Sequence, residues 1–438
     1  MNILEDLQAG RLAGSKRLDL ACGLTEFPRE IFTLADSLEV LNLTGNALSS
    51  LPDDLGRLQQ LRVLFCSENQ FSEFPASIGQ CPQLRIVGFK ANRIEHVPAS
   101  ALPPRLRWLI LTDNRITELP ETLGDCPDLQ KLMLAGNRLT ALPASLARCR
   151  QLELVRIAAN RLPHLPDWLL TLPRLAWLAY AGNPMPGDFS TPHDPGHTAD
   201  IDWSQLDVQH LLGEGASGLI HQALWRRPEC ADMPVAVKLY KGDITSDGSP
   251  LNEMNACIAA GIHRNLIRVE GRISGHPQAC SGLVMDLIDP GFANLAGPPS
   301  LDSCTRDIYA ADTRLDAAVA LRIASGIASV AAHLHGLGIA HGDLYAHNIL
   351  WNPEGECLLG DFGAASFYPL DDRQAVALQR IEVRAFGLLL GELLERSDAM
   401  AGREKLEDLQ ARCCQPNVLA RPDFTQVCKE LLQATRSL

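Results

Sequence analysis

Residues 38–52 read LEVLNLTGNALSSLP, and the same arrangement of leucines, one asparagine and a closing Leu-Pro returns along the first half of the chain. A fixed period of this length indicates a repeat architecture, in which each repeat buries its apolar face only against its neighbours. We expect the leucines to fill one continuous core and the asparagine side chains to hydrogen-bond backbone groups where the chain turns. The asparagines of the pattern recur every 22 or 23 residues, at Asn46, Asn69, Asn92, Asn114, Asn137, Asn160 and Asn183.

The pattern L-x-x-L-x-L-x-x-N-x-L-x-x-L-P resembles the leucine-rich-repeat family. The resemblance implies an α/β solenoid of about eight 23-residue repeats, which we place at residues 1–188. Residues that point outward from the predicted strands form an apolar stripe, which includes Trp108 and Trp177. Packing and partner binding explain such a stripe equally well. Arg62, Arg85 and Arg107 fall on successive strands about 5 Å apart, where their mutual repulsion implies an acidic partner.

A connector follows the repeats. Between Asn183 and Trp203 the repeat stops, and prolines and glycines accumulate. This composition is typical of a semi-extended linker. We therefore predict a linker at residues 189–202 and a second domain at residues 203–438.

Two motifs near the start of the second domain suit phosphate binding. A predicted strand at residues 205–212 precedes a glycine-rich stretch, whose backbone amides could approach phosphate oxygens closely. Val235-Ala236-Val237-Lys238 is typical of a buried strand that delivers one lysine, and Glu253, in a predicted helix at residues 251–260, fits its ion-pair partner. The glycine-rich stretch reads Gly213-Glu214-Gly215-Ala216-Ser217-Gly218-Leu219-Ile220.

Two further motifs follow a predicted helix at residues 315–337. The first reads His341-Gly342-Asp343-Leu344-Tyr345-Ala346-His347-Asn348, and the second reads Asp361-Phe362-Gly363. In this order and spacing, the four motifs resemble the protein-kinase family, and Arg421-Pro422 near the end is similar to the tyrosine-kinase-like group. The resemblance implies an α+β bilobal fold, with an N-lobe at residues 203–288 and a C-lobe at residues 289–438.

The kinase resemblance also implies site residues. Asp343 would be the catalytic base, Lys238 would hold the α- and β-phosphates of ATP, and Asn348 and Asp361 would hold Mg²⁺. Met285 would be the gatekeeper of the adenine pocket. Further ATP contacts are expected from the glycine-rich loop and its neighbouring strands, namely Gly213, Glu214, Gly215, Ala216, Ser217, Gly218, Ile220, Ala236, Glu253, Asp286 and Ile288.

The chain departs from the family pattern beside the catalytic base. Gly342 replaces an arginine that usually binds a phosphorylated activation loop, Tyr345 replaces a lysine, and Glu382 replaces an aspartate. No A-P-E motif follows Asp361, which leaves Arg421 without its usual glutamate. Because only Ser366 and Tyr368 are available in that short segment, we expect an active site assembled without loop phosphorylation, and unchanged activity when both are replaced.

Composition excludes some functions. The formal charge of −13 disfavours nucleic acid and anionic membranes as partners. The thirteen cysteines lack any C-x-x-C pair and are expected to be reduced thiols. The sequence shows no signal-peptide pattern and no run of eighteen apolar residues, so we predict a cytoplasmic protein without a membrane span.

The leading hypothesis is an ATP- and Mg²⁺-dependent protein kinase that favours Ser/Thr over Tyr and whose repeats bind or regulate a protein partner. A pseudokinase scaffold and a small-molecule phosphotransferase are the alternatives. The acidic kinase domain docking on Arg62, Arg85 and Arg107 would provide autoinhibition. The insert at residues 290–312 could cover the nucleotide entrance.

Overall fold

The computed structural model describes residues 3–185, 198–215, 217–227, 230–241, 244–245, 247–399 and 402–436. Its contacts divide the chain into two compact units. The first comprises Met1–Leu172 with Asn183–Met185, and the second comprises Pro173–Gly182 with Pro186–Leu438. The boundary thus differs from the predicted one at residue 188, because the segment Pro173–Gly182 associates with the second unit.

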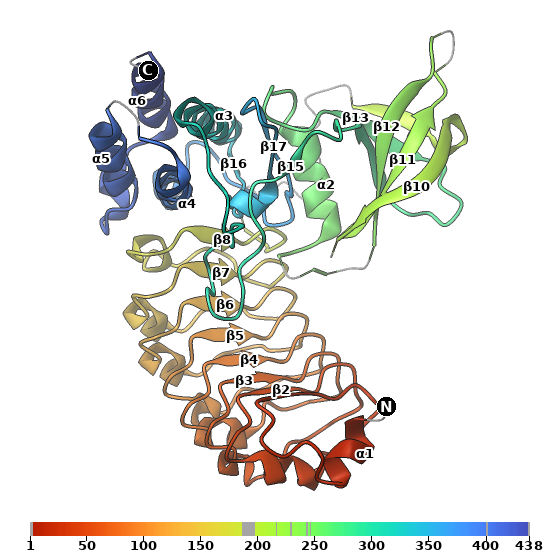
Figure 1. The fold of residues 1–438 in the computed structure, drawn as a ribbon, viewed down its shortest axis with the longest axis vertical. Helices are drawn as coiled ribbons and strands as arrows, with labels where there is room; N and C mark the ends of the chain where they lie inside the picture. Colours follow the sequence, from red (N-terminus) through yellow and green to blue (C-terminus); the bar gives the residue numbers. More distant parts are fainter. Residues whose placement is uncertain are drawn as a thin grey trace. The chain divides into compact units, whose positions relative to one another are not determined.

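The first unit is a coil of repeats with short parallel strands stacked in chain order (Figure 1). Each strand pairs in register with the next, so that Val40 lies beside Val63 and Val63 beside Ile86. The predicted α/β solenoid is therefore confirmed. After helix α1 (Ile3–Gln8), its strands are β1 (Arg17–Asp19), β2 (Val40–Asn42), β3 (Val63–Phe65), β4 (Ile86–Gly88), β5 (Trp108–Ile110), β6 (Lys131–Met133) and β7 (Leu154–Arg156). The connections contain 3-10 helices, η1 (Arg29–Leu34), η2 (Leu55–Arg57), η3 (Ala76–Gln80), η4 (Ala99–Ala101), η5 (Glu121–Asp125), η6 (Ala144–Arg148) and η7 (Leu169–Thr171).

The repeated asparagines hold the turns of the coil. Asn69 accepts a hydrogen bond from the backbone N–H of Leu48 at 2.9 Å and donates to the carbonyls of Leu43 and Cys66 at 2.9 and 3.1 Å. Because the polar atoms of this buried side chain are satisfied by two adjacent repeats, the bonds set the spacing between them. The same arrangement recurs at Asn46, Asn92, Asn114, Asn137 and Asn160.

The second unit begins, after the strand β8 (Trp177–Ala179), with a six-stranded sheet in the order β10-β11-β12-β14-β13-β9. Residues 199–202, which were predicted to be linker, form β9 and pair in parallel with β13. The remaining neighbours are antiparallel. The strands are β9 (Ala199–Asp202), β10 (Leu206–Glu214), β11 (Gly218–Trp225), β12 (Met233–Tyr240), β13 (Val269–Ser274) and β14 (Gly282–Asp286), with the 3-10 turn η8 (Trp203–Gln205) after β9.

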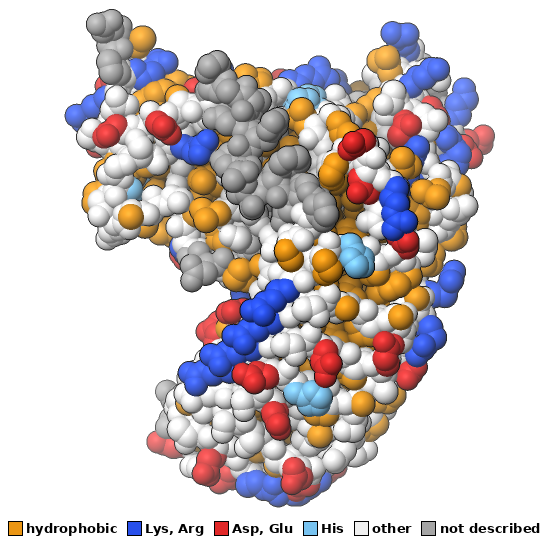
Figure 2. All heavy atoms as spheres, turned by 180° about the vertical axis from the view of Figure 1, so that it is seen from behind, with side chains coloured by type: hydrophobic (Ala, Val, Ile, Leu, Met, Phe, Trp, Pro, Cys, Tyr) orange, Lys and Arg blue, Asp and Glu red, His pale blue; other side chains and the backbone are white. Residues whose placement is uncertain are grey.

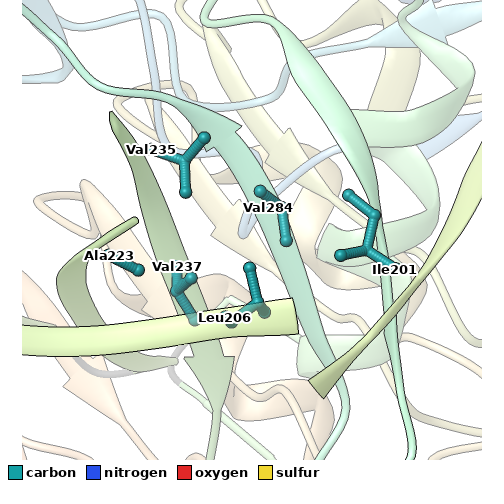
Figure 3. Close-up of a cluster of buried hydrophobic side chains, with 6 residues drawn as sticks. All are labelled: Ile201, Leu206, Ala223, Val235, Val237 and Val284. Atoms are coloured by element: carbon teal, nitrogen blue, oxygen red, sulfur yellow. The ribbon is translucent and has the colours of Figure 1, made fainter. Parts of the chain in front are cut away.

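Two apolar clusters fix this sheet. One gathers buried side chains from five strands, β9, β10, β11, β12 and β14, as Figure 3 shows for Ile201, Leu206, Ala223, Val235, Val237 and Val284. The other joins the sheet to helix α2 (Pro250–Ala259) through Tyr240, Leu283, Met285 and Ile258. The side chain of Ser249 caps α2 by accepting the N–H of Leu251, and Pro250 occupies the first turn, where no backbone donor is needed. The helix is thereby held against the strand that carries Lys238.

The rest of the second unit is mainly helical (Figure 1). Helix α3 packs against α4 and α6, and α4 packs against α5. The helices are α3 (Ala317–Gly336), α4 (Ala375–Arg396), α5 (Arg403–Cys413) and α6 (Phe424–Thr435), with η9 (Ala346–Asn348) and η10 (Val418–Ala420). Four short strands lie between α3 and α4, namely β16 (Ile339–Ala340), β17 (Ile349–Trp351), β18 (Cys357–Leu359) and β19 (Ser366–Phe367). A fifth, β15 (Ala293–Asn294), precedes α3 and pairs with β17.

Helix α3 is long and apolar enough to cross a membrane by length and composition, with a mean hydropathy of 1.5 in its most apolar window. Most of that window, 61%, is buried inside the protein. A central core helix has the same properties, since it is apolar on several faces. All thirteen cysteines are free thiols.

Candidate functional site

Lys238 and Glu253 form a buried ion pair. Lys238 lies on β12 and Glu253 on α2, and their side chains are 14% and 2% exposed. Burial alone would lower the pKa of Lys238, but the charge and hydrogen bond of Glu253 outweigh it, and the pKa lies above its ordinary value. Asp361 adds to this effect, which places a second carboxylate near the ammonium. Lys238 is therefore charged and fixed in direction at neutral pH.

The glycine-rich loop leaves room for a ligand. A β-carbon added at Gly213 or Gly215 would meet no atom within 4 Å, whereas one at Gly218 would lie 2.3 Å from the carbonyl of Leu239. The first two glycines thus face open space, and the third is required by packing. Glu214, the last residue of β10, pairs at 2.5 Å with Lys241, which follows the end of β12. Ala216 lies outside the described residues.

The expected adenine-contacting residues come together on the central strands. Ala236 of β12 lies opposite Met285 of β14, and both are buried. Ser217 immediately precedes β11, and Ile220 of β11 lies opposite Lys238. The backbone N–H of Asp286 donates to the carbonyl of Arg268 at 3.0 Å, and Ile288 follows the end of β14, half-buried.

The segment His341–Asn348, here called the catalytic loop, is held by its own side chains. The amide of Asn348 donates to the carbonyl oxygen of Asp343 at 2.9 Å and to its carboxylate at 2.8 Å. The ring of His341 is buried and bonds to the carbonyl of Gly360 at 2.9 Å. These contacts join the catalytic loop to the Asp361 motif and set the direction of the Asp343 carboxylate.

The donor set fits a magnesium ion. Because the nitrogen of the Asn348 amide is used by Asp343, its carbonyl oxygen remains as a ligand. Asp361 adopts a left-handed backbone conformation with φ of 51°. One of its carboxylate oxygens accepts the N–H of Gly363 at 3.1 Å, and the other oxygen could bind the metal ion. Magnesium prefers such oxygen ligands and is usually bound by one or two carboxylates together with phosphates.

Glu382 braces the catalytic loop in place of the usual aspartate. One carboxylate oxygen accepts the N–H of Gly342 at 2.7 Å, and the other pairs with His335 at 2.7 Å. Burial opposes the charge of Glu382, yet the hydrogen bonds and charges of its partners hold its pKa below the ordinary value. The replacement seen in the sequence therefore preserves a carboxylate beneath the loop.

Ser366 and Tyr368 are both sequestered. Ser366 is fully buried, and Tyr368 is 4% exposed. The hydroxyl of Tyr368 donates to the carbonyl of His335 at 3.3 Å and accepts from Gln379 at 3.1 Å. Burial raises the pKa of Tyr368 well above its usual range. Neither hydroxyl is accessible to a phosphorylating enzyme in this conformation.

One contact of the catalytic loop was missed by the sequence reasoning. Asp307, in the insert at residues 290–312, accepts the backbone N–H of His347 at 3.0 Å and bonds to its ring at 2.7 Å. The insert also contributes β15, which pairs with β17. The sequence could not predict this contact, because no local pattern links Asp307 to His347, which lies 40 positions later.

The prediction of Trp177 as a partner-binding residue was wrong. Its side chain is 2% exposed, because Pro173–Gly182 is packed within the second unit. Arg421, left without a glutamate in the sequence, donates instead to the carbonyls of Pro173, Arg380 and Gln415 at 2.9 to 3.0 Å. These backbone acceptors replace the missing carboxylate.

The other expected partner-binding residues lie on the first unit. Trp108 is half-buried, with Lys131 4.2 Å above its ring. Arg62 pairs with Glu39 at 3.3 Å, and Arg107 donates to Gln130 at 2.8 Å. Burial and the charges of Arg105, Arg62 and Arg107 lower the pKa of Arg85. Figure 2 shows a row of Lys and Arg side chains on one face of this unit, and this row is not assigned to Arg62, Arg85 and Arg107.

Comparisons with known proteins find leucine-rich repeats in the first half of the chain and a protein-kinase domain in the second. Residues 37–58 and 82–139 match leucine-rich-repeat families, and residues 206–386 match the family described as protein tyrosine and serine/threonine kinase. Ephrin type-A receptor 8 of Homo sapiens is 28% identical over 41% of this chain and 18% of its own length. Serine/threonine-protein kinase mos of Xenopus laevis is 28% identical over 38% of this chain and 43% of its own. Tyrosine-protein kinase abl-1 of Caenorhabditis elegans is 25% identical over 49% of this chain and 16% of its own.

The matches thus cover less than half the length of each of these relatives. The fold agrees with these matches, since a repeat solenoid is followed by a unit with a mixed sheet and several helices. The chain therefore carries leucine-rich repeats and, after them, a protein-kinase domain.

Proposed function

We propose that the chain is an ATP- and Mg²⁺-dependent protein kinase that phosphorylates serine or threonine in a protein. The observation that carries the proposal is the buried pair of Lys238 and Glu253, formed together with the hydrogen bonds from Asn348 to Asp343. Phosphoryl transfer depends on positioned charges more than on covalent chemistry. Both arrangements are assembled without a phosphorylated loop, since Ser366 and Tyr368 are buried.

In the proposed reaction, Asp343 accepts the proton of the acceptor hydroxyl while that oxygen bonds to the γ-phosphorus. The bond from the γ-phosphorus to the bridging oxygen breaks, and ADP leaves with the electron pair. Lys238 holds the α- and β-phosphate oxygens, and the backbone of Gly213 and Gly215 lies against the phosphates. Mg²⁺ held by Asn348 and Asp361 would supply positive charge to the phosphates.

The proposal is tested by incubating the full chain with Mg·ATP and mapping phosphosites by mass spectrometry. We expect Asp343→Asn, which is isosteric, to lower phosphorylation by roughly 10²-fold or more, since a general base is removed. Asp371→Asn, at an exposed position, is the matched control. Phosphosites that are equal in wild type and Asp343→Asn would contradict the kinase reading, and the acceptor residues found in wild type decide between Ser/Thr and Tyr.

A pseudokinase scaffold is the second candidate, favoured by Tyr345 at the position of the usual lysine. A chain that is stabilised by ATP in thermal unfolding but transfers no phosphate would support it.

For the first unit, we propose that Arg62, Arg85, Arg107 and Trp108 contact an acidic segment of a protein partner. The support is the stacking of Arg62, Arg85 and Arg107 on successive strands, where burial and neighbouring arginines lower the pKa of Arg85 although Asp128 opposes them. An acidic group would relieve this repulsion.

A further inference from the structure

The indole of Trp177 contacts two successive residues of the catalytic loop. Its ring N–H donates to the carbonyl of Leu344 at 3.0 Å, and its ring stacks on that of Tyr345 with centroids 4.1 Å apart and planes inclined by 6°. All three side chains are buried, with exposed fractions of 2%, 1% and 5%. Arg306 lies 5.3 Å from the Trp177 centroid. These contacts fall within the second unit, because Pro173–Gly182 belongs to it.

Leu344 and Tyr345 immediately follow the proposed base, Asp343. Asn348 holds Asp343 from the end of the catalytic loop through its carbonyl and carboxylate. The Trp177 contacts hold the residues between these two positions. The backbone that carries Asp343 is therefore fixed by a side chain from the last repeat as well as by the loop itself.

The segment that carries Trp177 is itself anchored at several points. The N–H groups of Tyr180 and Ala181 both donate to the hydroxyl of Ser366, at 3.0 and 3.2 Å. At its other end, Arg384 donates to the carbonyl of Arg174 at 3.1 Å, and Arg421 donates to that of Pro173 at 2.9 Å. Buried arginines with satisfied donors are rigid supports. Trp177 is thus held at a defined distance from the loop.

We infer that Trp177 is a positioning residue for Asp343, and that the segment Pro173–Gly182 takes over the anchoring role of the missing A-P-E region. The inference rests on the proposed kinase function for its effect on rate. Its structural basis is independent of that function, because losing the indole donor leaves the buried carbonyl of Leu344 without this partner. Small displacements of a catalytic group have large effects on rate.

The test uses the full chain with Trp177→Ala and Trp177→Phe. We expect Trp177→Ala to lower kcat by roughly tenfold to a hundredfold, with KM for ATP changed by less than about threefold, because the nucleotide contacts are untouched. Trp177→Phe keeps a stacking ring but loses the N–H donor, and should recover part of the rate. Hydrogen exchange at residues 341–349 without nucleotide should accelerate by roughly tenfold in Trp177→Ala.

Trp168→Ala is the matched control, since it removes a half-buried indole nine positions earlier in the chain. Unchanged exchange in the catalytic loop of Trp177→Ala, with or without a fall in kcat, would overturn the inference. A uniform rise in exchange across the second unit in both Trp177 variants would also overturn it, because the effect would then be general unfolding. If the wild type transfers no phosphate, the kinase proposal fails, while the exchange measurement still decides the role of Trp177.

Discussion

Gly342 has a backbone φ of 73°, in the left-handed region that side chains other than glycine rarely adopt. A β-carbon there would lie 2.5 Å from the carbonyl oxygen of Ala364 and 2.8 Å from that of Leu178. Both neighbours are backbone atoms, which cannot rotate away as a side chain would. The absence of the usual arginine beside Asp343 therefore follows from the space available at this position.

We predict that Gly342→Ala lowers the free energy of unfolding by about 2 kcal/mol or more, through backbone strain and overlap. Gly336→Ala is the control, because a β-carbon at that exposed glycine meets no atom within 4 Å. It should be neutral or stabilising by up to about 1 kcal/mol. Urea unfolding followed by tryptophan fluorescence measures both. Equal losses in the two variants would show that the close approach at Gly342 does not constrain the chain.

The sequence could indicate which motif residues pair with each other, but not the surroundings of a residue whose neighbours come from distant parts of the chain. Lys238 and Glu253 form the ion pair that the kinase resemblance implied, whereas the hydrogen bond from Asn348 to Asp343 was not predicted. Trp177 was assigned to a binding surface, because a strand position shows which way a side chain points but not what covers it. Its burial depends on residues more than 160 positions away.

The insert and the catalytic loop are coupled as elements through Asp307 and His347. Burial by itself would lower the pKa of His347, but the hydrogen bond and charge of Asp307, with Asp343 and Asp361 nearby, raise it above the ordinary 6.5. The folded state therefore binds the proton more tightly than the unfolded chain. This contribution to stability is fully present below pH 6.5 and is lost as the pH rises through the folded pKa.

We predict that Asp307→Asn lowers the pKa of His347 and flattens the loss of stability above pH 6.5. The NMR titration of the His347 ring measures the pKa, and thermal unfolding from acidic to alkaline pH measures the stability. Asp312→Asn, at an exposed position of the same insert, should change neither. A His347 pKa that is the same in all three proteins would exclude the coupling.

Elements with a clear local pattern were predicted closely. The helix expected at residues 315–337 is α3 at Ala317–Gly336, and the strand expected at 205–212 is β10 at Leu206–Glu214. Strand β9 was missed, because its four residues follow a proline- and glycine-rich stretch and pair with β13 about 70 residues later. Short elements that exist only through such distant pairing carry little local signal.

The whole molecule is acidic, but three arginines gather on the strands of the repeats. The chain carries a net −13, yet Arg62, Arg85 and Arg107 occupy equivalent places on successive strands, linked by backbone hydrogen bonds of 2.8 to 2.9 Å. A local positive field on an acidic protein selects acidic partners and speeds their encounter. We therefore expect the binding of an acidic partner to this surface to weaken as the salt concentration rises.

We predict that the full chain binds a polyglutamate peptide, and that the double variant Arg62→Glu with Arg85→Glu weakens binding by roughly tenfold or more. Calorimetric titration at low salt, and again at about 0.2 M salt where screening is stronger, measures the effect. Arg93→Glu with Arg138→Glu makes the same charge change at other exposed positions and should have a smaller effect. Equal weakening by both double variants would indicate attraction to net charge alone.

Because Pro173–Gly182 belongs to the second unit, its position limits where the repeats and the second unit can be recombined with those of another protein. Recombination at the apparent end of the repeats would separate Arg384 and Arg421 from the carbonyls they bond and remove Trp177 from the loop. A chimera that keeps residues from Pro173 onward retains these contacts. The unit that must be transferred intact is therefore the kinase domain together with strand β8.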